Sequence, residues 1–344
     1  MIKNRMFIFL CLVMLILICS TFGINAAKTP IYLAMGTGST GGSYYIWTNA
    51  IISMINEKSD YLNISPETVS GSANTVRVVN VKQLDFGCPM SDVTHHGWLG
   101  TREFEEKYQN IRVAYVFPMS GQGIVTTANS PINSVYDLKG KLIAVNSASG
   151  EQQLASYMEE AGLSLEKGDY KTRILTYNES AAALKDGAVD ASLQLVYPPA
   201  GAFLDLKSTI GIKVIYYPED IVDKIVAKYP MWSKNSVPKD VIASTDAEYE
   251  SKIPYKGIFG NTGSVIVHKD VPDEVVYDFV KLIYENLDGL AQIAPALGGL
   301  DFNYIQDFIN ANNPGIPWHS GALKYFEEIG IKIPSYVREE NFGS

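Results

Sequence analysis

The sequence predicts an α/β protein folded into two lobes. Between residues 31 and 92, short apolar runs alternate three times with glycine- or serine-rich loops and helical segments. That alternation is typical of a parallel sheet covered by helices. A similar series runs from 142 to 216, and β-type runs at 111–117, 123–127 and 264–268 lie around it. We therefore expect the chain to cross from a first lobe into a second and to return.

The first lobe follows from local patterns. Trp47, Ile51, Ile52 and Ile55 recur at helical spacing, which indicates an amphipathic helix after the first glycine-rich loop. We expect strands at 31–35, 64–69, 84–88 and 111–117, and helices at 44–57, 73–82 and 274–287.

The second lobe is predicted from the same kind of alternation. We expect strands at 123–127, 142–145, 172–176, 191–196 and 212–216, and helices at 151–160 and 180–186. The predicted lobes are therefore 28–117 with 262–344, and 118–261 between them.

Composition excludes several classes of protein. The 344 residues include 47% apolar side chains, enough for two cores of ordinary size. The net charge of −9 disfavours a nucleic-acid partner, because binding phosphates needs a basic surface. Three cysteines cannot build a disulfide scaffold.

The first 27 residues are typical of a signal peptide. Lys3 and Arg5 precede an apolar run from Met6 to Cys19, and small residues end the segment at Ala27. The run is shorter than the roughly 20 residues of a membrane span, although an uncleaved anchor is the alternative. We expect a periplasmic or other extracytoplasmic protein, with Cys88 as the one cysteine left after cleavage.

A glycine-rich loop, Gly36-Thr37-Gly38-Ser39-Thr40-Gly41, joins the first strand to the first helix. Its spacing matches the dinucleotide-binding fingerprint, but the second strand ends without the acidic residue that would hold a ribose. The more general interpretation is that backbone N–H groups at a helix N-terminus suit an anionic group.

Three further polar loops follow strands, at 71–74, 91–92 and 146–150. The carboxyl ends of strands are where open α/β sheets bind ligands, so four such loops on two lobes predict a shared cleft. The alternative is that their serines and asparagines are ordinary helix caps.

No catalytic constellation is evident. The Gly-x-Ser-x-Gly motif is absent, and Cys88, His95 and His96 fit no metal-ligand spacing. We therefore expect no enzyme activity, no catalytic residue, no metal ion and no cofactor.

The sequence resembles the TAXI group of solute-binding proteins, which serve tripartite ATP-independent periplasmic (TRAP) transporters. The resemblance covers nearly the whole chain after residue 27. It is carried by Gly36–Tyr45, Gly71-Ser72-x-Asn74, Asp85-Phe86-Gly87, Ser91-Asp92, Leu138–Lys141, Ala183–Gly187, Val189–Ala191 and Val271–Tyr277.

The resemblance implies a type II periplasmic-binding-protein fold, with two α/β lobes joined by a hinge and a ligand cleft between them. It implies capture of a small organic anion, a carboxylate or a glutamate-like amino acid, and delivery to TRAP membrane permease subunits. By analogy, the first lobe would contribute Ser39, Gly42, Ser43, Tyr44, Ser72, Asn74, Ser91 and Asp92.

The second lobe departs from the family pattern at two places. Ala148-Ser149-Gly150-Glu151 stands where the family usually has Gly-Ser-Gly-Thr, and Tyr197-Pro198-Pro199 stands where it usually has Gly-x-Pro. We expect Glu151 to compete with an anionic ligand at its helix N-terminus, and Tyr197 to narrow the cleft. That lobe would then meet an uncharged, hydroxylated or amine-bearing part of the ligand. Its expected ligand-binding residues are Asn146, Ser149, Gly150, Glu151 and Tyr197.

Two other functions remain open from the sequence. The same fold serves ABC-type importers, which a neighbouring ATPase gene instead of a TRAP permease gene would indicate. An exported cleft enzyme such as a hydrolase is the other alternative, which the missing nucleophile–base pair disfavours.

Overall fold

The computed structural model describes residues 28–197, 199–215, 217–229, 232–236, 257–312 and 314–342. The predicted signal peptide, residues 1–27, lies outside these residues. Among the residues described, no helix combines the length and apolar character that crossing a membrane requires.

The first sheet has five strands in the order β2-β1-β3-β12-β4. β1 pairs in parallel with β2 and β3, whereas β12 runs antiparallel to β3 and β4. The strands are β1 (Ile31–Gly36), β2 (Leu62–Glu67), β3 (Phe86–Gly87), β4 (Ile111–Val116) and β12 (Ser264–His268). The helices around this sheet are α2 (Ser43–Lys58), α3 (Ser72–Asn80), α4 (Ser91–Leu99), α11 (Asp273–Glu285), α12 (Leu287–Ile293), α13 (Phe302–Asn310) and α14 (Ser320–Glu328).

The second sheet has the order β10-β11-β5-β8-β6-β7, and β9 also pairs with β5. Its strands are β5 (Ser120–Thr127), β6 (Leu142–Val145), β7 (Lys171–Ile174), β8 (Ala191–Tyr197), β9 (Ile212–Ile215), β10 (Trp232–Ser236) and β11 (Gly257–Asn261). Its helices are α5 (Ala148–Glu160), α6 (Tyr177–Lys185), α7 (Gly201–Thr209) and α8 (Glu219–Lys228).

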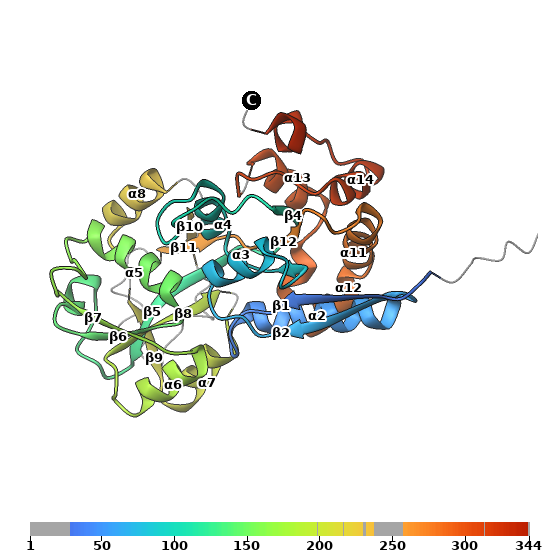
Figure 1. The fold of residues 1–344 in the computed structure, drawn as a ribbon. Coiled ribbons are helices and arrows are strands. Elements are labelled where there is room, and N and C mark those ends of the chain that lie inside the picture. The colour runs from blue at the N-terminus through green and yellow to red at the C-terminus, as the bar shows by residue number, and fades with distance from the viewer. Residues whose placement is uncertain are drawn as a thin grey trace, which may run out of the picture.

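The predicted fold class is confirmed: two α/β lobes each carry their own sheet (Figure 1). The chain passes between the sheets twice, from β4 to β5 through 117–119 and from β11 to β12 through 262–263. These paired crossings lie side by side, because Phe117 N–H donates to the Gly263 carbonyl at 2.9 Å. The exact lobe boundaries, 117/118 and 261/262, stay a prediction.

Burial explains why the first sheet forms where it does. Every residue of β4 and β12 is buried, as expected for strands covered on both faces. α11 packs over the sheet with Val275, Val276, Phe279, Val280 and Ile283, and Phe279 stacks on Phe86 of β3 with ring centroids 4.5 Å apart. The core of the first lobe is therefore continuous from the N-terminal strands to the C-terminal helices.

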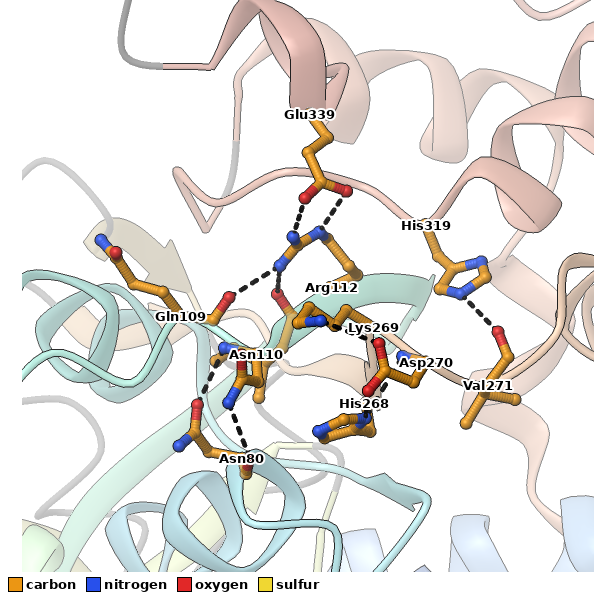
Figure 2. A network of polar contacts seen from close by, with 11 residues as sticks. Asn80, Gln109, Asn110, Arg112, His268, Lys269, Asp270, Val271, His319 and Glu339 are labelled. Carbon is orange, nitrogen blue, oxygen red and sulfur yellow. Dashed lines mark hydrogen bonds and ion pairs between the residues drawn. The ribbon is translucent and has the colours of Figure 1, made fainter.

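One buried charge ties the C-terminus to this core. Arg112 of β4 is 4% exposed, and its guanidinium pairs with the Glu339 carboxylate (Figure 2). It also donates to the backbone oxygens of Gln109 at 2.9 Å and Ile111 at 2.7 Å. Because a buried charge is costly unless it is paired, Arg112 fixes the short 3-10 helix Glu339–Asn341 on the sheet.

The structure differs from the sequence prediction at β3, which has two residues where five were expected. Asp85 explains the difference, because its carboxylate accepts the Ala34 N–H at 2.9 Å where a backbone oxygen would continue the ladder. The β10–β11 hairpin and the helix α4 were not predicted.

Candidate functional site

A cavity of about 50 Å³ lies between the two lobes. By the measure that one water needs about 10–15 Å³, it has room for a few waters or one small molecule. Its lining comes from both lobes: Gly38, Ser39, Gly42, Tyr44, Val69, Gly71, Ser72, Thr75, Cys88, Met90, Val93, Gln122, Asn146, Ser147, Ser149, Gly150, Gln153 and Tyr177. All these residues are uncharged or weakly ionising side chains, so within the described lining no ammonium, guanidinium or carboxylate is present.

The structure brings more than half of the predicted site residues to this cavity. Those that line it are Ser39, Gly42, Tyr44, Ser72, Asn146, Ser149 and Gly150. Those that do not are Ser43, Asn74, Ser91, Asp92 and Glu151. Tyr197 ends β8 opposite Gly121, and its side chain lies outside the described residues.

Local contacts explain why some predicted residues face elsewhere. The Asn74 side chain is exposed to solvent. Ser91 is buried and accepts a hydrogen bond from Thr262 Oγ1 at 3.4 Å. Asp92 is buried, and its carboxylate Oδ2 lies 3.5 Å from Nη1 of the Arg102 guanidinium.

Glu151 points away from the cavity. Its carboxylate accepts the hydroxyl of Thr172 on the edge strand β7. The charge still lies in the first turn of α5, where it offsets the positive helix end. Glu151 is not among the residues that line the cavity, and its expected competition with an anionic ligand stays a prediction.

Five helices begin at the cavity wall: α2, α3, α4, α5 and α6. α2 and α3 have glycine N-caps, Gly42 and Gly71, with no side-chain cap and no acidic residue in the first turn. α5 is capped by Ser147, whose hydroxyl oxygen accepts the Gly150 N–H at 3.1 Å. The N-terminal ends of α2 and α3 thus carry positive partial charge that no acidic residue of their own first turns offsets, which favours an anion between them.

Three residues that line the cavity each have a polar side-chain atom that is buried without a hydrogen-bond partner. These atoms are Ser39 Oγ from the first lobe, Gln122 Oε1 from β5 and Asn146 Oδ1 from the second lobe. Ser39 is 6% exposed and Gln122 is 3% exposed. Since more than nine in ten buried polar groups are paired in native proteins, a bound molecule that reached these atoms could complete their hydrogen bonds.

The two lobes touch at residues that line the cavity. The Ala73 N–H, at the start of α3, donates to Ser149 Oγ of the second lobe at 3.1 Å. The Tyr44 hydroxyl lies 3.3 Å from Ser120 Oγ, where the chain enters β5. These contacts define a closed arrangement of the lobes around the cavity.

Glycine is required where the lobes meet. A Cβ atom on Gly41 would lie closer than 3.0 Å to the Asn178 amide, and one on Gly71 would lie 2.7 Å from Ser147 Cβ. Both glycines also have positive φ, +86° and +84°, which other residues rarely adopt. These two glycines therefore allow close approach as well as the turn.

Several cavity residues were missed by sequence reasoning, above all Gln122, Gln153 and Tyr177. Tyr177 opens α6 directly after β7, so the rule that strand ends form the site could have found it. Gln122 was expected between the strands 111–117 and 123–127, but it lies inside β5, which begins at Ser120. Gln153 lies one turn into α5, and its amide donates to the Tyr157 hydroxyl at 2.6 Å.

Cys88 is a free, buried cysteine. Burial raises the pKa of its thiol to about 12, so the sulfur is protonated at neutral pH. The thiol lies 3.2 Å from Thr48 Oγ1 and donates to the Gly36 carbonyl at 3.1 Å. Cys88 is therefore a packed wall of the cavity rather than an activated nucleophile.

A second hollow, of about 380 Å³, lies on the outer side of the first lobe beside Arg112 and Trp98. Its charged groups are already paired, Arg112 with Glu339 and Lys269 with Asp270 (Figure 2). Among the described residues no group of His, Cys, Asp and Glu side chains could hold a metal ion.

The family model described as the NMT1-like family matches residues 35–330. The chain belongs to the NMT1-like family. Because the match spans both lobes, every cavity residue lies within the NMT1-like region.

Solved structures of low sequence identity resemble this NMT1-like protein. The alkanesulfonate-binding protein SsuA from Xanthomonas axonopodis pv. citri, bound to MOPS, is 14% identical over 88% of this chain and 92% of its own, with a TM-score of 0.46. A putative L-cystine ABC transporter protein from Listeria monocytogenes is 13% identical over 78% and 96%, with a TM-score of 0.47. A probable amino-acid ABC transporter extracellular-binding protein from Bacillus subtilis is 15% identical over 77% and 97%, with a TM-score of 0.43.

Proposed function

We propose that this protein is an extracytoplasmic solute receptor that captures a small organic anion and hands it to a membrane permease. The observation that carries the proposal is the cavity between the lobes, which both lobes line and close. A cleft of this kind suits a protein that binds by closure and releases by opening. The signal-peptide pattern of residues 1–27 supports the extracytoplasmic location.

Anion capture would depend on neutral donors. The N-terminal ends of α2 and α3 meet at the cavity, and hydroxyls of Ser39, Ser72 and Ser149 lie beside them. Hydrogen bonds to a charged group contribute about 1.5–3 kcal/mol each. A few of them support a micromolar dissociation constant, about −8 kcal/mol, after the cost of ordering.

The delivery route in this proposal is a TRAP permease, and its support is the motif resemblance to TAXI proteins over nearly the whole chain after residue 27. Transport by the purified receptor with its permease in proteoliposomes tests the route. Uptake driven by an ion gradient without ATP supports a TRAP partner. Uptake that requires ATP hydrolysis would instead identify an ABC importer.

Binding is tested on the purified full-length protein. Isothermal titration with carboxylates, sulfonates, amino acids and neutral sugars should find a saturable ligand, and mass spectrometry of the unfolded protein should recover a co-purified one. The recovered compound is then incubated with the protein and its products are analysed. Chemical turnover of that compound would indicate that the protein is an exported enzyme and not a receptor.

A further inference from the structure

The residues that line the cavity favour one kind of small carboxylate ligand over another. Resting on the proposed solute-binding function, we propose that the ligand is a small hydroxy acid and that the site discriminates against the amino acid of the same carbon skeleton. The hydroxyl of a hydroxy acid and the ammonium of the matching amino acid are attached to the same carbon atom. The discrimination therefore depends on which protein groups surround that position in the cavity.

The carboxylate end has a defined place. α2 and α3 begin at the cavity without a side-chain cap and without an acidic residue in the first turn. Their N–H groups and partial positive charge attract an anion. The Ala73 N–H of α3 is already directed toward the second lobe, where Ser149 Oγ accepts it at 3.1 Å. An oxygen of the ligand carboxylate can bind in the same region.

The other end of the ligand meets oxygen acceptors. Gln122 Oε1 and Asn146 Oδ1 are buried without a donor, and Ser39 Oγ is buried without a partner of either kind. The nitrogen of the Gln122 amide lies 3.9 Å from Met90 Sδ, and the amide also forms a hydrogen bond with the Tyr177 side chain. Asn146 Oδ1 occupies space that Gly150 leaves open, since a Cβ atom there would lie closer than 3.0 Å to it. A ligand O–H group supplies the donor that these oxygens lack.

Charge decides between a hydroxyl and an ammonium. Both groups can donate to amide oxygens, but an ammonium buried between helix N-termini is repelled by their positive ends. A buried cation needs an ionised partner, and no carboxylate is among the described lining residues. The acidic residues predicted for the site, Asp92 and Glu151, pair with Arg102 and with Thr172 instead. A neutral hydroxyl donates without that cost.

Matched pairs of ligands test this inference. Titrations of the full-length protein compare lactate with alanine, glycerate with serine, and 2-hydroxyglutarate with glutamate. In each pair that binds, the hydroxy acid should bind at least tenfold more tightly. Equal or tighter binding of the amino acid would overturn the inference and leave the receptor function standing, as would binding of sulfonates or sugars alone. If no compound of the whole panel binds, the receptor function itself fails.

A charge placed on the wall tests the mechanism. Gln122→Glu puts a carboxylate where the orphaned amide oxygen lies, so the preference for the hydroxy acid over its amino partner should fall at least tenfold. Asn146→Asp, at a half-buried position, gives a second test with less risk to folding. Gln109→Glu adds the same charge on the exposed surface and should leave the preference unchanged. If both wall variants fold and keep the wild-type preference, these amides do not select the ligand.

Discussion

Replacing Gly42 with alanine should hinder closure of the two lobes. Gly42 is the N-cap of α2 with φ −85° and ψ 156°, an extended conformation that alanine adopts freely. A Cβ atom there would lie 3.0 Å from Cδ2 and Cε2 of Tyr177, which belongs to the second lobe. Carbon atoms in ordinary contact are about 3.5–4.0 Å apart, so the closed lobes must separate by about 0.5–1 Å.

The magnitude follows from the cost of overpacking. Inserting a methyl group into a packed contact costs about 1–3 kcal/mol. Here most of that cost falls on the closed state, because the Tyr177 ring leaves Gly42 when the lobes open. A penalty of that size on the binding-competent state raises the ligand dissociation constant by about 5- to 150-fold. The radius of gyration measured with ligand should also remain closer to that of the open form.

Two measurements separate this effect from a general loss of stability. The new methyl would also lie 3.2 Å from the Ser39 carbonyl oxygen, a contact inside the first lobe, so urea unfolding must be measured alongside binding. Gly289→Ala in α12 is the matched control, because no heavy atom lies within 4 Å of the added Cβ. Titration with the best-binding compound and small-angle scattering supply the readouts. A Gly42→Ala protein that binds and closes like the wild type would refute the reasoning.

Three further predictions concern closure and acid stability. Ser149→Ala leaves the Ala73 N–H without its acceptor in the other lobe, so the dissociation constant of the ligand should rise about 5-fold or more. Ser156→Ala, on the exposed part of α5, is the control and should leave that constant unchanged in the same titration. Burial lowers the pKa of His319, so below its ordinary value of 6.5 the unfolded chain binds a proton that the folded protein does not, and stability should fall as the pH drops. His319→Asn should flatten that slope in urea denaturation, and an unchanged slope would contradict the assignment. The buried Arg112 guanidinium lowers the pKa of the Glu339 carboxyl, so the ionised pair stabilises the fold above pH 4.5, the ordinary pKa, and stabilises it less at lower pH. Glu339→Gln should lower the free energy of unfolding at pH 7 and reduce its further decrease at acid pH.

The architecture was predictable because its periodic elements are long or repeated. The alternation of strand, loop and helix gave the correct class, and strands such as β1 and β6 lie within one residue of expectation. β3 was overestimated because the sequence cannot show that the Asp85 carboxylate replaces a backbone acceptor in the ladder. The β10–β11 hairpin carries no apolar alternation that would mark it, since Lys234 and Asn235 lie in its first strand.

The site was predictable in its loops and not in its side-chain directions. The loops expected to form the cleft contain Ser39, Ser72 and Ser149, and all three residues line the cavity. Asn74 and Glu151 were predicted at the site from the family resemblance, but whether a residue in a first helical turn faces the other lobe depends on how the lobes pack. The sequence also gives no sign that a strand residue such as Gln122 would face a ligand.

Two glycines of the first lobe have two roles, and both roles depend on the absence of a Cβ atom. Gly42 and Gly71 lack side chains, which leaves the N-terminal ends of α2 and α3 accessible to an anion. The same lack of a Cβ atom lets Tyr177 and Ser147 of the second lobe approach to contact distance. Ligand capture and lobe closure therefore depend on the same backbone positions. A substitution that only weakened the anion contact would leave closure of the lobes intact. Gly42→Ala should affect both anion binding and closure, so the radius of gyration and the ligand dissociation constant should change together.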